Sequence, residues 1–297
     1  MRIAAILTAT AAVALIGAAP AKKPPTPSEI VANAPASAWK GIDQDNLLVL
    51  EMKNGGRVMI QLAPDFAPVH VANIRALAKA RWWDGAAIYR VQDNYVVQWG
   101  KNESSDPLPA AVVAKPPAEY HRKLAGLPVH PLGSPDAYAP KAGYALGWPI
   151  GYDPKAGTAN LTHCYGYVGV GRDLSPDTGT GGELYAVIGH APRHLDRNIT
   201  VIGRIIEGIE NMSALPRGTE ALGFYKERSM DVPIASVRLA SDLPEAERPA
   251  FEYINTSSPT FAAYVKGRAN RNDDFFIRPA GGVDLCNAAV PVRRRPS

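Results

Sequence analysis

The chain has 297 residues, a formal net charge of +4 at pH 7 and 46% hydrophobic residues. That length and hydrophobic content indicate a globular protein with a sizeable core and suggest about two domains. The small charge argues against a nucleic-acid partner, because the Arg293-Arg294-Arg295 run stands at the C-terminus as a solvated tail and no basic face is interleaved with aromatic residues.

The first 21 residues predict a cleaved secretory signal. Arg2 supplies a positive start, residues 3–17 form an uncharged apolar segment, and Ala19-Pro20-Ala21 offers the small-x-small pattern that a signal peptidase reads. The alternative is a membrane anchor, but the apolar run is shorter than the roughly 20 residues that span a bilayer, and no other segment is long or apolar enough. We therefore expect an exported protein without a membrane span after cleavage, periplasmic if the source is a Gram-negative bacterium.

Residues 22–37 are rich in proline and alanine and have little periodicity, so we expect an extended linker over residues 22–45. The strand-like runs Leu47–Met52 and Arg57–Leu62 follow, joined by a turn that contains Asn54-Gly55, the strongest short hairpin signal. A helix is expected next, from Pro68 to about Ala80, because proline suits the first helical position and apolar residues recur at helical spacing. The chain thus opens with a hairpin and a helix.

A second strand pair is expected at Ile88–Val91 and Tyr95–Trp99, which flank a tight turn at residues 92–94. Arg90 stands inside this apolar pair. An unpaired buried guanidinium costs about 5 kcal/mol of desolvation, so Arg90 needs either a partner or an outward-facing use.

Residues 101–163 differ in composition and pattern from the segments before them. They contain many of the prolines, and their apolar residues show no sustained periodicity. We expect an irregular surface insertion that shapes specificity, docks a partner or only covers the neighbouring structure.

Regular structure is expected again after residue 164. The later strands are predicted at residues 165–171, 183–188, 199–206 and 234–240, with a short helix at residues 209–215. The Gly-x-Gly pattern in the first of these strands does not predict a phosphate loop, because no helix follows it. Ser258-Pro259 predicts the start of a helix through Arg268, and residues 275–292 are expected to be extended.

Several ordered motifs resemble those of cyclophilin-type peptidyl-prolyl cis-trans isomerases. They are the Tyr89–Val91 and Tyr95–Gly100 strand pair, "AP-x-x-x-x-N" at residues 67–73, "WDG" at residues 83–85, the strand at residues 181–186, and "LD" at residues 195–196 with the glycine-containing strand that follows. The resemblance covers residues 47–240 apart from the insertion, and it is to an exported bacterial form with an insertion and a C-terminal extension.

The resemblance implies a mainly β fold. We expect a closed eight-stranded antiparallel β-barrel capped by two helices over residues 46–242, interrupted by the insertion at about 101–163. The extension, residues 243–297, is expected to pack on the barrel.

The resemblance also implies the site. Arg90 is the catalytic cation, and Gln98 holds the substrate backbone and orients Arg90. The residues expected to bind the substrate are Tyr95, Val96, Gly171, Glu183, Tyr185, His194, Leu195 and Ile199. Amide resonance puts a barrier of about 20 kcal/mol on prolyl rotation, and a cationic donor aimed at the prolyl nitrogen lowers it. No cofactor or metal is required, and the expected partners are proline-containing polypeptides.

Some positions depart from the family pattern. His194 stands where many members have tryptophan, Ile199 where many have histidine, and Glu183 where glutamine is usual, so we expect reduced or shifted activity. Two alternatives stay open: a catalytically silent peptide-binding chaperone and an envelope-assembly factor. Arg90 and Gln98 favour catalysis, because a pure binder has no need of a cation that weakens resonance.

The two cysteines, Cys164 and Cys286, are too far apart in sequence for a C-x-x-C metal site. In an oxidising compartment they are expected to form one disulfide, which would hold the C-terminal extension near residue 164. His190 and His194 are a weak metal pair, because Pro192 lies between them and no further ligand has suitable spacing.

Overall fold

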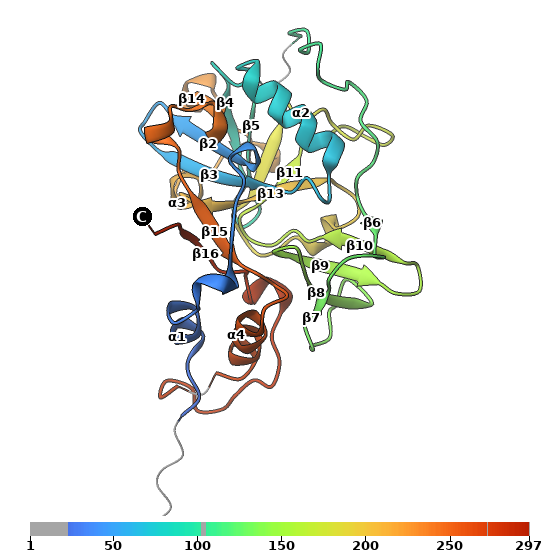
Figure 1. Cartoon of the computed structure of the whole chain (residues 1–297). Coiled ribbons are helices and arrows are strands. Elements are labelled where there is room, and N and C mark those ends of the chain that lie inside the picture. The colour runs from blue at the N-terminus through green and yellow to red at the C-terminus, as the bar shows by residue number, and fades with distance from the viewer. Residues whose placement is uncertain (1–22, 102–104, 272, 297) are drawn as a thin grey trace, which may run out of the picture.

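The computed structural model describes residues 23–101, 105–271 and 273–296, so the expected signal, residues 1–21, lies outside the described residues. Eight antiparallel strands close a barrel in the order β11-β12-β5-β4-β14-β2-β3-β13 (Figure 1). This confirms the predicted fold class. The barrel strands are β2 (Leu47–Met52), β3 (Arg57–Leu62), β4 (Ala87–Val91), β5 (Val96–Gly100), β11 (Tyr167–Val170), β12 (Leu184–Val187), β13 (Val201–Glu207) and β14 (Val232–Leu239).

Two helices add to the barrel core. The first, α2 (Pro68–Lys79), begins with proline at its first position and buries Ile74 and Leu77 among the inward-facing residues of the strands. The second, α3 (Glu210–Ser213), contributes the buried Met212. Apolar residues at helical spacing therefore meet the alternating apolar residues of the strands in one core, as the periodicity predicts.

The insertion contains more regular structure than we expected. Its residues from 122 to 161 form a five-stranded antiparallel sheet in the order β6-β10-β9-β8-β7. The irregular-insertion prediction is therefore wrong over this stretch, because β8 and β9 are buried along almost their whole length and show no apolar-polar alternation. The strands are β6 (Arg122–Lys123), β7 (His130–Pro131), β8 (Lys141–Ala145), β9 (Trp148–Asp153) and β10 (Thr158–Leu161).

The expected extended linker is also corrected. Residues Pro27–Ala32 form the helix α1, which starts with a capping box between Thr26 and Glu29. Strand β1 (Trp39–Gly41) then pairs with β15 (Phe251–Ile254), which in turn pairs with β16 (Val292–Arg294). A helix of six residues leaves little periodicity in the sequence, and it is supported here by packing against α4 (Pro259–Ala269), beside which it lies in Figure 1.

A second hydrophobic core joins three distant parts of the chain. Trp39 comes from the N-terminal segment, Tyr144 from the insertion and Phe261 from the C-terminal extension, and all three are buried in one cluster. The Tyr144 hydroxyl donates to the backbone carbonyl of Ala288 at 2.9 Å. The extension therefore packs on the insertion and the N-terminal segment as well as on the barrel, where Phe251 joins another buried cluster.

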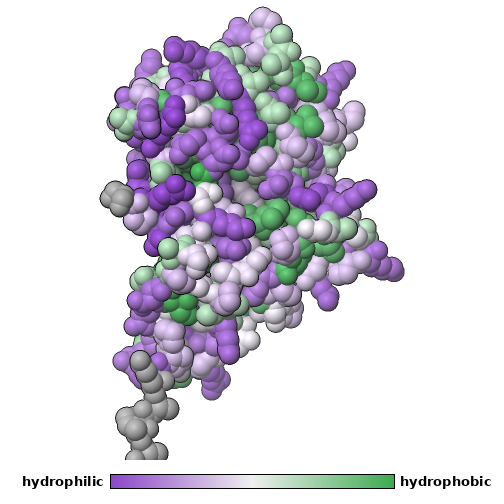
Figure 2. Space-filling model, viewed as in Figure 1, coloured by the Kyte–Doolittle hydropathy of each residue, from purple (hydrophilic) through white to green (hydrophobic). Residues whose placement is uncertain are grey.

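The sulfur atoms of Cys164 and Cys286 lie at bonding distance, with 5.2 Å between the Cα atoms. Among the described residues no helix is long and apolar enough to cross a bilayer. On the face of the molecule in Figure 2, apolar patches are scattered among hydrophilic ones.

Candidate active site

A cavity of about 400 Å³ opens between the barrel strands and the loops beside them. It brings together all the predicted site residues except Glu183 and His194. Its lining consists of Arg90, Tyr95, Val96, Gln98, Val170, Gly171, Arg172, Asp173, Tyr185, Leu195, Ile199, Leu222 and Phe224. Most of the apolar side chains come from β5, β11, β12 and the loop before β13, so the barrel strands fix one wall of the cavity.

Arg90 lies at the edge of this cavity on β4, directly opposite Gln98 of β5. Its Nη1 donates to Gln98 Oε1 at 2.9 Å, its Nη2 to Gln92 Oε1 at 2.6 Å, and its Nε to the carbonyl of Leu222 at 2.7 Å. The guanidinium is half-buried. Arg90 therefore has partners and also faces the cavity, so both of the alternatives expected for an arginine in an apolar strand are present.

Burial lowers the pKa of Arg90 from its ordinary value, and the nearby hydroxyls of Tyr95, Tyr89 and Tyr185 act in the opposite direction. The ordinary value is so high that the side chain stays cationic. A half-desolvated cation interacts more strongly with a ligand than one in bulk water does.

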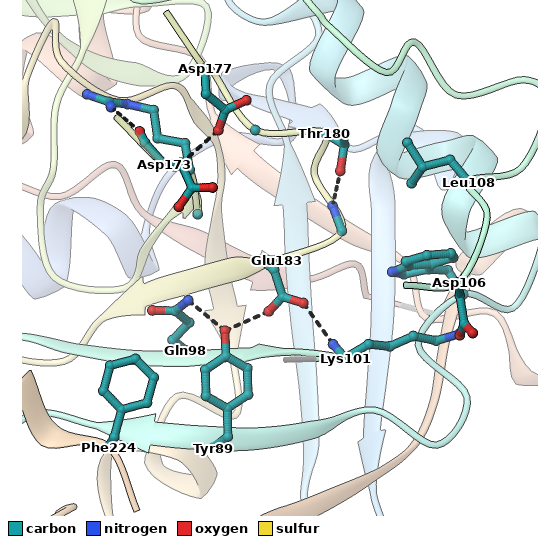
Figure 3. A pocket seen from close by; sticks show the side chains of 15 residues that line it. Tyr89, Gln98, Lys101, Asp106, Leu108, Asp173, Asp177, Thr180, Glu183 and Phe224 are labelled. Carbon is teal, nitrogen blue, oxygen red and sulfur yellow. Dashed lines mark hydrogen bonds and ion pairs between the residues drawn. The ribbon is translucent and has the colours of Figure 1, made fainter. Parts of the chain in front are cut away.

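A further row of hydrogen bonds, beyond those of Arg90, holds the Gln98 side chain. Its Nε2 donates to the Tyr89 hydroxyl at 2.6 Å, and that hydroxyl donates to Glu183 Oε2 at 2.6 Å. Glu183 Oε1 also accepts from the backbone N–H of Lys101 at 2.9 Å. Figure 3 shows this row, with Tyr89 between Gln98 and Glu183. Burial, and then the neighbouring Glu183 carboxylate, raise the pKa of Tyr89, so its hydroxyl remains a donor.

Glu183 itself lines a neighbouring cavity of about 510 Å³ (Figure 3). The two cavities share five lining residues: Gln98, Gly171, Arg172, Asp173 and Phe224. This second cavity is more highly charged. Its charged lining residues are Lys101, Asp106, Arg172, Asp173, Asp177 and Glu183. Glu183 therefore contributes through Tyr89 and through this second cavity rather than as a wall of the first.

His194 does not line the first cavity. It is exposed, and its ring stacks on Tyr95 with 6.3 Å between the ring centroids and 7° between the planes. Tyr95 does line the cavity. His194 thus supports a wall residue instead of forming the wall.

Sequence reasoning missed the loop around Leu222 and Phe224. Phe224 forms an isolated bridge with Arg90, its ring centroid lies 5.5 Å from the guanidinium carbon, and it stacks on Tyr89 at 5.9 Å. The carbonyl of Leu222 is one of the acceptors for Arg90. The loop has no periodicity, and the only signal in the sequence is the aromatic pair Phe224-Tyr225.

The described residues contain no group of three or more histidine, cysteine, aspartate or glutamate side chains that could hold a metal ion. The cavity instead presents a fixed cation, an amide and an apolar wall. That combination can bind an apolar ring and donate hydrogen bonds to an amide beside it.

The chain is similar to known proteins in sequence and in fold. A model of the cyclophilin type peptidyl-prolyl cis-trans isomerase family matches residues 47–239. Relatives described as probable peptidyl-prolyl cis-trans isomerases occur in Brucella suis (23% identical) and Brucella abortus (22%). Each alignment spans 182 residues, which is 60% of this chain and 76% of the relative. The crystal structure of a cyclophilin from Hirschia baltica matches with a TM-score of 0.69 at 22% identity, over 90% of this chain and 96% of that one.

Proposed function

The chain belongs to the cyclophilin-type peptidyl-prolyl cis-trans isomerase family, and we propose that it binds the proline of its substrates in the cavity beside Arg90. It is a peptidyl-prolyl cis-trans isomerase that acts on X-Pro bonds. The observation that carries the assignment of the site is the Arg90 guanidinium, which is held by three acceptors and faces an apolar cavity that also contains Tyr185 and Leu195.

The chemistry follows from the amide bond. Rotation about the prolyl C–N bond localises the nitrogen lone pair, and a positioned cationic donor stabilises that twisted state more than the planar ground state. Arg90 supplies the donor. Gln98, fixed by Tyr89, orients Arg90 and has an amide with which to hold the substrate backbone. Each 1.4 kcal/mol or so of such selective stabilisation gives about a tenfold increase in rate.

Replacing Arg90 by alanine tests this assignment. The variant should fold, because the half-buried side chain adds little to the core, but it should lose about 2 to 4 kcal/mol of transition-state stabilisation, or roughly 30- to 1,000-fold in kcat/KM. A protease-coupled assay with a proline peptide measures the rate, circular dichroism checks the fold, and Arg57→Ala on β3 is the matched control.

Two results would contradict the assignment. An Arg90→Ala variant with wild-type kcat/KM would remove Arg90 from the mechanism. A wild-type protein that binds proline peptides but gives no rate above background would instead favour a catalytically silent peptide-binding chaperone.

We also propose that the substrates are exported proteins and that Cys164 and Cys286 form a disulfide after export. The signal pattern in residues 1–21 supports export, and the bonding distance between the two sulfurs supports the disulfide. Mass spectrometry of the exported protein should find Lys22 at its N-terminus, and non-reducing peptide mapping should recover the linked pair. An intact Met1 in a membrane fraction would contradict export, and two free thiols would contradict the disulfide.

A further inference from the structure

A row of buried polar side chains leads from the cavity into the insertion. The hydroxyl of Tyr185, which lines the cavity, lies 2.9 Å from His163 Nε2, and His163 Nδ1 lies 2.9 Å from Asp196 Oδ1. Arg193 bonds the other oxygen of Asp196 and reaches both oxygens of Asp136 at 3.0 Å. All five side chains are buried.

The hydrogen bonds in this row have a defined direction. Burial raises the pKa of Tyr185 well above its ordinary value, so its hydroxyl keeps its proton. The Asp196 carboxylate accepts both from the backbone N–H of His163 at 2.9 Å and from its ring. A carboxylate can only accept, so His163 carries a proton on Nδ1, and Asp196 fixes the orientation of the ring. Nε2 of the neutral imidazole is then the acceptor for the Tyr185 hydroxyl.

The strand beneath Tyr185 leaves room for this arrangement. Gly169 of β11 is the registered partner of Tyr185 on β12. A Cβ atom at residue 169 would lie 2.3 Å from both the Cζ and the hydroxyl oxygen of Tyr185. The ring therefore lies flat across a glycine. The bond to His163 is the one hydrogen bond described for the hydroxyl at its far end.

The other end of the row is anchored in the insertion. Asp136 accepts hydrogen bonds from the backbone N–H groups of Tyr138 and Ala139 at 3.1 and 2.9 Å, so its carboxylate is held by its own loop as well as by Arg193. Arg193 is sandwiched between Asp136 and Asp196. Burial alone would lower its pKa, but its bonds to these two carboxylates raise it, so Arg193 remains a fixed cation between them.

We propose that His163 is a positioning residue for proline recognition. It holds the Tyr185 ring as a wall of the cavity, and Asp136 holds His163 through Arg193 and Asp196. Both His163 and Asp136 belong to the insertion, which thereby gains a role in shaping the site. The inference rests on the proposed function, because it takes the cavity beside Arg90 as the proline site.

Three variants test the proposal: Tyr185→Phe, which removes only the hydroxyl; His163→Leu, which removes the imidazole and leaves no polar atom to bond the hydroxyl; and Asp136→Asn, which removes the distal charge. A ring that is no longer held should weaken binding of the substrate and of the transition state to the same extent. Tyr185→Phe and His163→Leu should therefore each raise KM about 3- to 10-fold while kcat changes less than about twofold, and Asp136→Asn should raise KM by less. The double variant Tyr185→Phe/His163→Leu should be no worse than either single variant, because both remove the same bond.

The matched control is His121→Leu, the same change at an exposed histidine of the insertion, which should leave KM and kcat at wild-type values. Thermal unfolding is measured for every variant. Lowered melting temperatures with unchanged KM would overturn the proposal, because the row would then support only the fold. Additive effects in the double variant would also overturn it.

Titration of the same proteins with a proline peptide, followed by NMR, separates this proposal from the proposed function. A wild-type protein that binds the peptide without turnover would contradict the isomerase mechanism, and weaker peptide binding by His163→Leu would still support positioning. If the wild-type protein neither binds nor isomerises proline peptides, both proposals fail.

Discussion

At the scale of single residues, Arg90 is held by three acceptors: a glutamine on the facing strand, a glutamine two residues away, and a backbone carbonyl from a distant loop. These bonds use three of its five N–H donors and fix the plane of the guanidinium. The guanidinium that lines the cavity is therefore held in one orientation, which a flexible cation cannot provide.

Lysine at residue 90 tests the importance of that plane. The ammonium of Arg90→Lys keeps the charge but lacks the planar fork, so it cannot reach Gln98, Gln92 and Leu222 together while facing the substrate. We expect kcat/KM within about fivefold of the alanine variant rather than near the wild-type value. The protease-coupled assay measures it, with Arg57→Lys as the control. Activity close to wild type would mean that charge alone is sufficient.

The tyrosines near Arg90 predict the behaviour of the protein at high pH. Burial raises the pKa of Tyr89, Tyr95 and Tyr185 above the ordinary value of about 10. Above that pH the unfolded chain loses tyrosine protons that the folded chain keeps, so deprotonation favours unfolding. The free energy of unfolding should therefore be steady between about pH 7 and 9 and fall as the pH rises beyond about 10.

Urea unfolding at a series of pH values measures this effect. Tyr185→Phe should reduce the loss of stability at high pH, whereas Tyr165→Phe, at an exposed tyrosine, should not. Over the range in which the protein is folded, kcat/KM should show no alkaline limb from these hydroxyls. A decline in both stability and activity that begins below about pH 9 would contradict the assignment of these tyrosines as protonated.

At the scale of elements, the sequence predicted best where a local signal and the tertiary structure agree. The β2–β3 hairpin and α2 lie within a residue of their expected bounds, because Gly55 takes the positive φ of the turn and Pro68 starts the helix. The sequence did not predict the insertion sheet or α1. Tertiary packing stabilises both, and neither shows a periodic pattern of apolar residues in the sequence. The same holds for Phe224, which reaches the site only through the loop between α3 and β14.

Helix α4 allows a test of local signals that is separate from catalysis. The Ser258 side chain accepts a hydrogen bond from the N–H of Phe261 at 3.1 Å and caps the helix. Ser258→Ala should lower the free energy of unfolding by about 1 kcal/mol. It should leave kcat/KM unchanged, because α4 does not line the cavity.

The adjacent exposed Ser257, for which only a backbone hydrogen bond is described, provides the matched control Ser257→Ala. Chemical denaturation measures both variants. Equal stability of the two would show that the cap contributes nothing, and a fall in kcat/KM for Ser258→Ala would show that α4 is coupled to the site.

At the scale of the whole molecule, the parts outside the barrel depend on one another. Strand β1 from the N-terminal segment pairs with β15 of the extension, and the second core needs Trp39, Tyr144 and Phe261 from three separate segments. The extension alone contributes too few apolar residues for a core of its own. Its folding therefore depends on the insertion, and anything that joins the two should stabilise both.

The proposed disulfide would join Cys286 of the extension to Cys164, directly after the insertion, and its removal tests that dependence. Cys164 and Cys286 are 122 residues apart, and the chain-entropy model gives a cross-link over a loop of that length about 4 to 5 kcal/mol. The double variant Cys164→Ser/Cys286→Ser should lose stability of that order in urea unfolding. Wild-type protein unfolded under reducing conditions is the control, because it lacks the cross-link but keeps the cysteine side chains. Oxidised and reduced wild-type protein of equal stability would mean that the second core, and not the disulfide, holds the extension in place.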